Sequence, residues 1–266
     1  MSLTGVGIGW RPEIAGFVAG LPGLRFVEVI AESLGPQGLP WALADLRDRD
    51  VAIVPHGVKL SLGGAEPVSE NRLAQLAAAA VVTEAPLVSE HLAFVRAGGL
   101  EAGHLLPLPR SWQAVNAVVA NVRRAQEKLP VPIALEPIAA LFDWPDDDLT
   151  EAQFVTEILE RTDALLLLDV ANVYANALNR GMDPQSNLED WPLERLAYVH
   201  IAGGRVSGGL YHDTHTDPVP PEVLELLSRV KAPAVLLERD GDYPPGEQLR
   251  AELDAIAAAA GFEEVT

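Results

Sequence analysis

Five of the six histidines in this 266-residue chain lie at the end of a short apolar run or in the loop that follows one: His56, His91, His200, His212 and His215. Carboxylates follow other runs in the same way, at Glu136, Asp169 and Glu238. Imidazole nitrogens and carboxylate oxygens together suit iron, manganese or zinc, whereas Ca²⁺ and Mg²⁺ prefer oxygen alone. The spacing therefore indicates a metal centre assembled from several strand ends.

The candidate ligands comprise imidazoles, carboxylates and one amide: His56, His91, Glu136, Asp169, Asn172, His200, Asp213, His215 and Glu238. One ion needs only three or four protein ligands, so this set predicts two or three ions, with a carboxylate such as Glu136 shared between them. Carboxylates gathered in one cavity would repel one another strongly without cations. Taken singly, each residue is explained as well by a hydrogen-bonded strand end, a loop cap or a surface turn. Their joint occurrence at successive strand ends favours the metal centre.

The composition limits other chemistries. The chain has no Cys, which excludes thiolate ligands, a Cys nucleophile and disulfide bonds. Its 38 acids against 19 Lys and Arg give a net charge of −19, so a phosphate backbone would be repelled and nucleic acid is not expected as a partner. The apolar runs are shorter than the ~20 residues of a membrane span, and no signal peptide is evident. We expect a cytoplasmic protein without a membrane partner.

Short strands alternate with helices along the chain. The apolar, strand-like runs cover 6–10, 26–31, 51–54, 87–89, 131–135, 164–168, 196–199 and 234–237. Helix-start signals lie between them: Pro12, Pro40, Ser69, Ser111 and a capping box of Thr150 with Gln153. They predict helices over 12–19, 40–46, 70–82, 112–128, 154–161, 220–230 and 246–260, with Gly261 as the last stop.

This alternation predicts the fold class. Eight strand–helix units without an intervening linker are typical of a (β/α)8 TIM barrel, so we expect an α/β protein with a single such domain over residues 1–266. In that fold the active-site residues come from the carboxyl ends of the strands, where the candidate ligands lie. The rival, a doubly wound open sheet, usually carries a Gly-rich phosphate turn after its first strand. Gly5, Gly7 and Gly9 have the wrong spacing for that turn, which favours the barrel.

Longer motifs connect these residues in a fixed order. They are Gly7-Ile-Gly-Trp-Arg-Pro-Glu13, Glu28-x-x-x-Glu32, Pro55-His-Gly-x-x-Leu-Ser-Leu-Gly63, Ser89-Glu-His-Leu-Ala-Phe94, Leu106-Pro-Leu-Pro109, Leu135-Glu136, Leu168-Asp-Val-Ala-Asn-Val-Tyr174, His200-Ile-Ala-Gly203, Asp213-Thr-His215 and Leu237-Glu-Arg-Asp240. Through them nearly the whole chain resembles the multinuclear non-heme iron-dependent oxidative enzymes, the family of the methanobactin-biosynthesis oxidase. The resemblance implies a xylose-isomerase-like TIM barrel and an oxidoreductase of natural-product biosynthesis.

The resemblance also implies how the ligands are shared. One iron would be held by His56, His91 and Glu136, a second by Glu136, Asp169, His200 and Glu238, and a third, most weakly, by Asn172, Asp213 and His215. Among these ligands, His56, Glu136, Asp169 and His200 would carry the catalysis. Family members use such Fe(II)/Fe(III) ions, with O2 as co-substrate, to modify a residue, commonly Cys, of a ribosomally made precursor peptide. They usually act with a separate peptide-binding partner protein, and we expect the same of this chain.

The chain departs from the family pattern at three positions. Ser33 and Pro137 stand where Asn is common, and Gly204 stands where His is common. These positions lie beside the ligands rather than among them, where neighbouring groups set the orientation of a ligand. The resemblance therefore implies a substrate that can differ from those of better-known members.

Other functions of the same barrel stay open. The ligand series also resembles the trinuclear-zinc endonucleases that cut abasic DNA, so a metal-dependent hydrolase or phosphodiesterase is the first alternative. Those enzymes have His at the position of Asn172, and the charge of −19 disfavours DNA. A sugar isomerase would need a catalytic Lys or His system that the sequence does not reveal. A metal-binding protein without catalytic activity is the last alternative.

Overall fold

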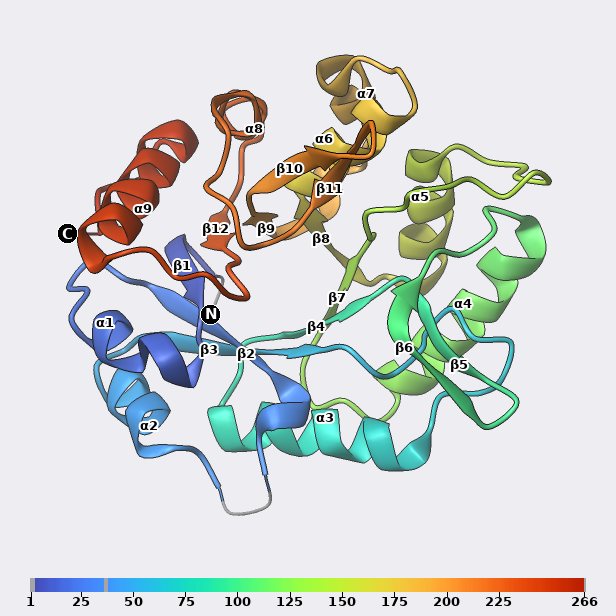
Figure 1. The fold of residues 1–266 in the computed structure, drawn as a ribbon. Coiled ribbons are helices and arrows are strands. Elements are labelled where there is room, and N and C mark those ends of the chain that lie inside the picture. Colours follow the sequence, from blue (N-terminus) through green and yellow to red (C-terminus); the bar gives the residue numbers. More distant parts are fainter. Residues whose placement is uncertain (1–2, 36–37, 266) are drawn as a thin grey trace.

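The computed structural model describes residues 3–35 and 38–265. Parallel strands close a barrel at its centre (Figure 1), in the order β1-β12-β9-β8-β7-β4-β3-β2. These strands are β1 (Gly5–Gly9), β2 (Phe26–Ile30), β3 (Ala52–Gly57), β4 (Val88–His91), β7 (Ile133–Glu136), β8 (Leu165–Asp169), β9 (Leu196–Ile201) and β12 (Ala234–Leu237). Apart from two inserted hairpins, the strands follow the chain order around the barrel. The (β/α)8 prediction is confirmed.

Helices surround the barrel (Figure 1). They are α1 (Ala15–Ala19), α2 (Trp41–Asp48), α3 (Glu70–Thr83), α4 (Trp112–Gln126), α5 (Glu151–Thr162), α6 (Val170–Asn179), α7 (Pro184–Glu189), α8 (Pro221–Leu227) and α9 (Gly246–Ala260). The predicted capping box forms before α5, with Thr150 and Gln153 each bonding the other's backbone. Ser111 caps α4 through its side chain, whereas Ser69 makes no such bond at α3. Gly261 ends α9 in the left-handed conformation, at φ 75°.

Helix α6, which begins directly after β8, is not among the helices expected from the sequence. Asp169 ends the strand and also caps the helix, because its carboxylate accepts hydrogen bonds from the backbone N–H groups of Ala171 and Asn172. A single residue that is both strand end and N-cap leaves no separate loop in which a start signal could stand.

Two β-hairpins are further additions to the predicted pattern. One consists of β5 (Phe94–Ala97) and β6 (Leu100–Leu106), and the other of β10 (Gly204–Ser207) and β11 (Leu210–Asp213). Each turns through a Gly-Gly pair with positive φ, 58° and 78° in the first hairpin and 60° and 84° in the second. Such turns need φ > 0 at both central residues, which glycine adopts without strain. The second hairpin leads directly to His215.

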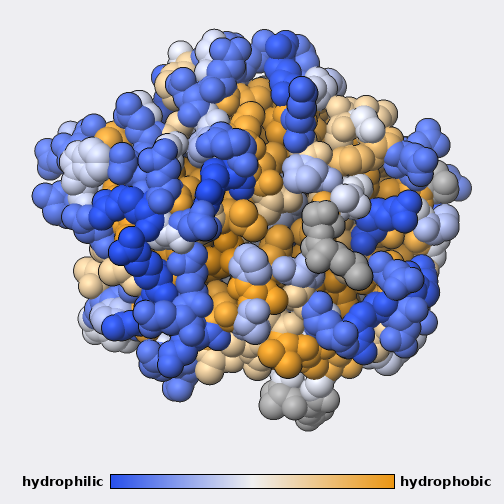
Figure 2. Space-filling model, turned by 180° about the vertical axis from the view of Figure 1, so that it is seen from behind, coloured by the Kyte–Doolittle hydropathy of each residue, from blue (hydrophilic) through white to orange (hydrophobic). Residues whose placement is uncertain are grey.

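The apolar residues form the packing around the barrel. A large cluster lies between the strands and the helices, and a smaller one that includes Phe26, Val54, Leu167, Tyr198 and Leu236 fills the barrel interior. On the face drawn in Figure 2, hydrophilic side chains surround the periphery and hydrophobic ones lie towards the middle. Within the described ranges, no helix has the length and apolar character needed to cross a membrane.

Candidate metal centre

The carboxyl ends of neighbouring strands bring the predicted ligands to one place. Six of them end or follow barrel strands: His56 in β3, His91 in β4, Glu136 in β7, Asp169 in β8, His200 in β9 and Glu238 just after β12. The register pairs His91 with Glu136 across β4 and β7. It likewise pairs Asp169 with His200 across β8 and β9. Parallel strands therefore hold ligands at one level of the barrel.

The first group of ligand atoms is a triangle. His56 Nε2 lies 3.3 Å from His91 Nε2, and Glu136 Oε2 lies 3.5 Å and 3.4 Å from these two nitrogens. Ligand atoms at about 2.1 Å from a tetrahedral metal lie roughly 3.4 Å from one another, so the triangle has the dimensions of a metal site. The side chains of His56 and Glu136 are buried, and that of His91 is 12% exposed.

A second group shares Glu136 with the first. His200 Nδ1 lies 3.3 Å from Glu136 Oε1 and 3.0 Å from Glu238 Oε2. Asp169 joins them, with ligand atoms of the four side chains all within 4.8 Å of one another. Glu136 thus presents one carboxylate oxygen to each group, which is the arrangement of a bridging ligand.

A third group lies towards the β10–β11 hairpin. His215 Nε2 is 2.6 Å from Asp213 Oδ2 and 3.8 Å from Asp169 Oδ2. On its other side, His215 Nδ1 lies 3.5 Å from both Glu238 Oε2 and Asp240 Oδ2. His215 therefore connects the third group to the second.

Asn172 and Asp240 complete this region in different ways. The amide nitrogen of Asn172 donates to the carbonyl of Pro137, which leaves its buried amide oxygen without a partner. Asp240 binds Arg11, at 2.5 Å, and also forms a candidate ligand group with His215 and Glu238.

Unpaired buried atoms test whether a metal fits. Five polar side-chain atoms of the candidate ligands are buried without a hydrogen-bond partner in the described structure: Glu136 Oε2, Asp169 Oδ2, Asn172 Oδ1, His200 Nδ1 and Asp213 Oδ1. Native proteins rarely leave such atoms unpaired, because a buried polar group without a partner is destabilising. All five can coordinate a cation through a lone pair. The donor set, nitrogen and oxygen in closed groups, therefore fits a transition metal such as iron, manganese or zinc.

The pKa values show what holds the metal-free site together. Burial favours the protonated form of Glu136, but the imidazoles of His200 and His91 outweigh burial and lower its pKa to about 2. Burial disfavours the imidazolium of His91, yet the carboxylates of Glu136 and Glu90 raise its pKa to about 9. Burial and the nearby Asp213 raise the pKa of Asp169 to about 7. Nearby carboxylates thus raise the pKa values of the His91 and His200 imidazoles and favour their protonated forms.

Three residues missed as site members surround the ligands. Glu28, Ser89 and Tyr198 are buried and hydrogen-bond to one another or to the histidines. Glu28 appeared in the sequence only within a motif of the family. The available signal was an acid inside the apolar strand 26–30, since a carboxylate buried there needs a partner.

Three basic residues that are close to the candidate ligands in the chain have other partners. Arg239 is buried and donates to Glu252 and to the carbonyl of Thr216, so it is not free to bind a substrate carboxylate. Arg205 pairs with Asp217 at the surface. His212 contacts the carbonyl of Ser207 and joins none of the ligand groups.

The structure also places the three departures from the family pattern. Ser33 bonds the carbonyl of Ile30, and the carbonyl of Pro137 receives the amide of Asn172. Gly204 has no space for a side chain, because a Cβ there would overlap the backbone oxygen of His212. The His common at that position in the family therefore does not fit this hairpin.

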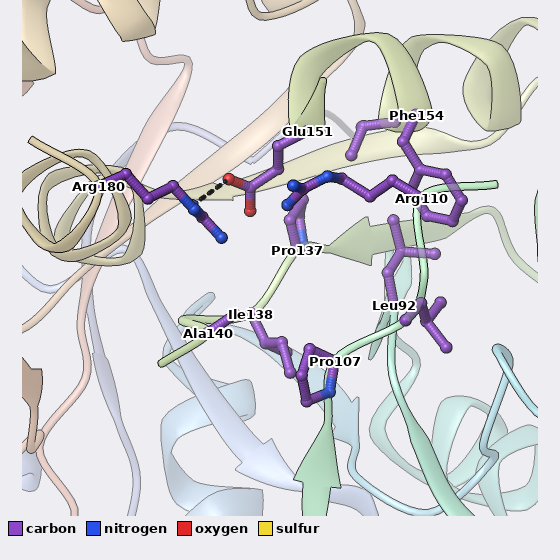
Figure 3. Close-up of a pocket in the computed structure, with 11 residues that line it drawn as sticks. Leu92, Pro107, Arg110, Pro137, Ile138, Ala140, Glu151, Phe154 and Arg180 are labelled. Carbon is purple, nitrogen blue, oxygen red and sulfur yellow. Dashed lines mark hydrogen bonds and ion pairs between the residues drawn. The ribbon is translucent and has the colours of Figure 1, made fainter. Parts of the chain in front are cut away.

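A small cavity of about 40 Å³ is formed by residues that follow β4 and β7 and by residues of α5 and its surroundings (Figure 3). Leu92 and Pro137, which line it, directly follow the ligands His91 and Glu136 in the chain. The polar part of its lining consists of Glu151, Arg110 and Arg180, and Figure 3 shows the 3.2 Å ion pair of Arg180 with Glu151. The cavity is thus an apolar hollow with a charged wall, and two of its lining residues directly follow candidate ligands in the chain.

Comparison with known proteins identifies relatives of the whole barrel. A UPF0276 protein of Streptomyces avermitilis is 52% identical over 267 residues, which cover 96% of this chain and 55% of that protein. This chain therefore spans only about half of that relative. A UPF0276 protein of Caulobacter vibrioides is 36% identical over 266 residues, covering 97% of this chain and 95% of the relative.

Solved structures share the fold at low identity. Endonuclease IV from Thermus thermophilus matches with a TM-score of 0.62 and 20% identity, covering 97% of this chain and 98% of that one. A 3-keto-D-glucoside 4-epimerase from E. coli matches with a TM-score of 0.60 and 14% identity, covering 96% and 99%. These likenesses support the xylose-isomerase-like barrel and nothing about the reaction.

One family model matches residues 5–261, nearly the whole chain, and describes the RiPP precursor modification enzymes MbnB/TglH/ChrH, where a RiPP is a ribosomally made, later modified peptide. The match includes all of the ligand groups described above. The chain belongs to this family of peptide-modifying enzymes.

Proposed function

We propose that this protein is an O2-dependent oxidoreductase that uses two or three iron ions to modify a residue, with Cys as the first expectation, of a ribosomally made precursor peptide. The observation that carries the proposal is the shared carboxylate of Glu136, whose two oxygens serve adjacent ligand groups at 3.3–3.5 Å. Membership of a peptide-modifying family supports the substrate class.

In this proposal each candidate ligand group would hold one ion. The first ion would be held by His56, His91 and Glu136, the second by Glu136, Asp169, His200 and Glu238, and the third by Asn172, Asp213 and His215. Bound iron would supply the one-electron chemistry that O2 activation requires. The protein contributes neutral imidazoles, a shared carboxylate and a buried surrounding from which bulk water is largely excluded.

The small cavity lined by Leu92 and Pro137, which directly follow two candidate ligands in the chain, is where we place the side chain to be modified. Its apolar wall, which includes Leu92 and Pro107, would shield a reacting side chain from water. Glu151 and Arg180 form its polar end. A cavity of about 40 Å³ accepts a small side chain rather than a whole peptide, so the rest of the peptide would lie across the barrel mouth or on a partner protein.

The test is peptide modification itself. A precursor peptide encoded beside the gene of this protein would be incubated with the iron-loaded enzyme, with and without its neighbouring partner protein, and its mass measured. The proposal predicts a mass change that needs both iron and O2 and that disappears in the Glu136→Gln variant. Modification of the peptide without O2, or by the zinc-loaded enzyme, would contradict it.

A metal-dependent hydrolase is the second candidate, because zinc accepts the same nitrogen and oxygen donors. It would use a metal-activated water on an ester rather than O2 on a peptide. The net charge of −19 would repel a substrate with many phosphate groups, such as a nucleic acid. Hydrolysis of a phosphodiester by the zinc-loaded protein, with no O2 uptake by the iron-loaded one, would favour this function over the oxidase.

A further inference from the structure

Each histidine of the first two groups bonds a second partner through the ring nitrogen that faces away from the ligand atoms. A neutral imidazole carries its proton on one nitrogen and a lone pair on the other, so this partner decides which nitrogen can bind metal. His91 Nδ1 lies 3.2 Å from the carbonyl oxygen of Gly57, which can only accept. In its neutral form His91 therefore donates from Nδ1, and the lone pair on Nε2 faces Glu136.

His200 is held in the opposite sense. Its Nε2 lies 2.9 Å from Glu28 Oε2, a carboxylate oxygen that accepts the proton of this nitrogen. The lone pair then belongs to Nδ1, the atom that faces Glu136 and Glu238.

His56 is the undecided case, because its partner is a hydroxyl. His56 Nδ1 lies 2.8 Å from Ser89 Oγ, and a serine hydroxyl can donate or accept. The choice depends on what else binds the serine. Ser89 Oγ lies 2.8 Å from the phenol oxygen of Tyr198, another group that can do either.

Glu28 settles the direction of the whole chain of hydrogen bonds. The Tyr198 hydroxyl lies 2.5 Å from Glu28 Oε2, and a carboxylate can only accept, so Tyr198 donates its single proton there. The phenol oxygen must then accept the proton of Ser89. Ser89 in turn accepts from His56 Nδ1, and the lone pair of His56 remains on Nε2, where the first metal would bind.

Because these side chains are buried, water does not compete for their hydrogen bonds, and the protein alone sets the direction in which protons are donated. Glu28 is 1% exposed, and His56, Ser89 and Tyr198 are fully buried. The four side chains come from β2, β3, β4 and β9, so barrel strands fix their spacing. The Tyr198 ring is also fixed edge-on against Phe26, with ring centroids 6.0 Å apart.

We propose that Glu28 is a positioning residue that sets the tautomers of two metal ligands in opposite senses, acting on His200 directly and on His56 through Tyr198 and Ser89. Glu28, Tyr198 and Ser89 are called the Glu28 relay. This role rests on the metal centre of the proposed function. Partners of this kind fix the ring orientation and the basicity of a ligating histidine.

The relay makes a selective prediction for Tyr198→Phe. Without the phenol oxygen, Ser89 has lost the group that takes its proton and can donate to His56 Nδ1 instead. The His56 proton then moves to Nε2 and competes with the first metal. His200 keeps its bond to Glu28, so the second group is unaffected. Loss of such a partner typically weakens metal binding about 10- to 100-fold.

The test uses zinc as a diamagnetic probe on the wild-type protein, Tyr198→Phe, Ser89→Ala and the control Tyr243→Phe, which removes a phenol hydroxyl outside the relay. Chelator competition measures the zinc affinities, and nitrogen-15 NMR of histidine-labelled, zinc-loaded protein shows which ring nitrogens carry protons. We expect one zinc to bind about 10- to 100-fold more weakly in Tyr198→Phe and Ser89→Ala, and the Nδ1 proton resonance of His56 to shift or disappear. The Nε2 resonance of His200 and the control variant should match wild type.

Two results would overturn the relay. One is a Tyr198→Phe protein with wild-type zinc affinities and an unchanged His56 resonance. The other is equal weakening of every zinc together with a lower melting temperature of the metal-free protein, which would mean that Tyr198 acts through packing alone. A wild-type protein that binds no zinc and no iron would instead contradict the metal centre, and with it the proposed function.

Discussion

A metal ion that binds at this site has to displace protons from its ligands. The pKa of His91 gives the expected size of the resulting pH dependence of metal affinity. The pKa of its imidazolium is raised to about 9 in the metal-free protein, because the carboxylates of Glu136 and Glu90 outweigh burial. At pH 7 the protonated form therefore exceeds the neutral form by about 100-fold, and about 2.7 kcal/mol of binding free energy is spent on removing the proton. The apparent affinity of the first site should rise about tenfold per pH unit up to pH 9 and then level off.

The assay is calorimetric titration of zinc at pH 8 in buffers of different ionisation enthalpy, which counts the protons released. About one proton should leave His91 for the ion that it binds, and His91→Ala should release about one proton fewer in total. A zinc affinity that is independent of pH between 7 and 9, with no dependence on the buffer, would refute the assignment of His91 as a protonated ligand.

The same pKa shift affects the stability of the metal-free protein. The pKa of His91 in the folded state lies above its ordinary value of 6.5, so the stability that it contributes is fully present below pH 6.5 and is lost as the pH rises through about 9. Bound metal replaces the proton as the counter-charge. Alkaline destabilisation between these pH values should therefore be weaker in the metal-loaded protein, which denaturant unfolding at several pH values would show.

Three further predictions follow from the site and the fold. His215→Ala should lower the metal content by about one ion per chain, measured by plasma mass spectrometry, and an unchanged content would remove His215 from the ligands. Removing metal with a chelator should lower the melting temperature, since metal at 100 times its Kd stabilises the folded state by about 2.7 kcal/mol, and equal melting temperatures with and without metal would contradict binding to the native site. Gly203→Ala should lower the free energy of unfolding by about 1–3 kcal/mol, because a Cβ there would overlap the backbone oxygen of Asp217. The control Gly16→Ala in α1 has open space and should be neutral or stabilising. Equal stabilities of the two variants in urea unfolding would show that the backbone at Gly203 can relax.

The barrel could be predicted from the sequence because it depends on local signals, and the same signals located the candidate ligands at strand ends. Alternation of apolar runs with capped helices predicts βα units, and the rule that barrel strands place their ends at one face brings His56, Glu136 and His200 together. The distances among these side chains depend on closure of the barrel between β1 and β12, which pairing of distant segments decides. No local pattern contains that information.

The residues that were missed share a physical reason. Glu28 and Tyr198 are 170 residues apart in the chain. Their hydrogen bond forms only because the barrel brings their two strands to the same interior. Helix α6 was not predicted because Asp169 both ends β8 and caps the helix, so no separate loop with a helix-start signal precedes it. The hairpins begin beside ligands, after His91 and after His200, where continuous βα alternation was expected.

Iron content tests the central claim most directly. The protein would be produced and purified without oxygen, its metals measured by plasma mass spectrometry, and the metal-free form reconstituted with Fe(II). The proposed function predicts two or three irons per chain, about one fewer in His215→Ala, and O2 consumption when the precursor peptide is present. Tightly bound zinc, with no iron taken up on reconstitution, would contradict the oxidase and favour metal-assisted hydrolysis.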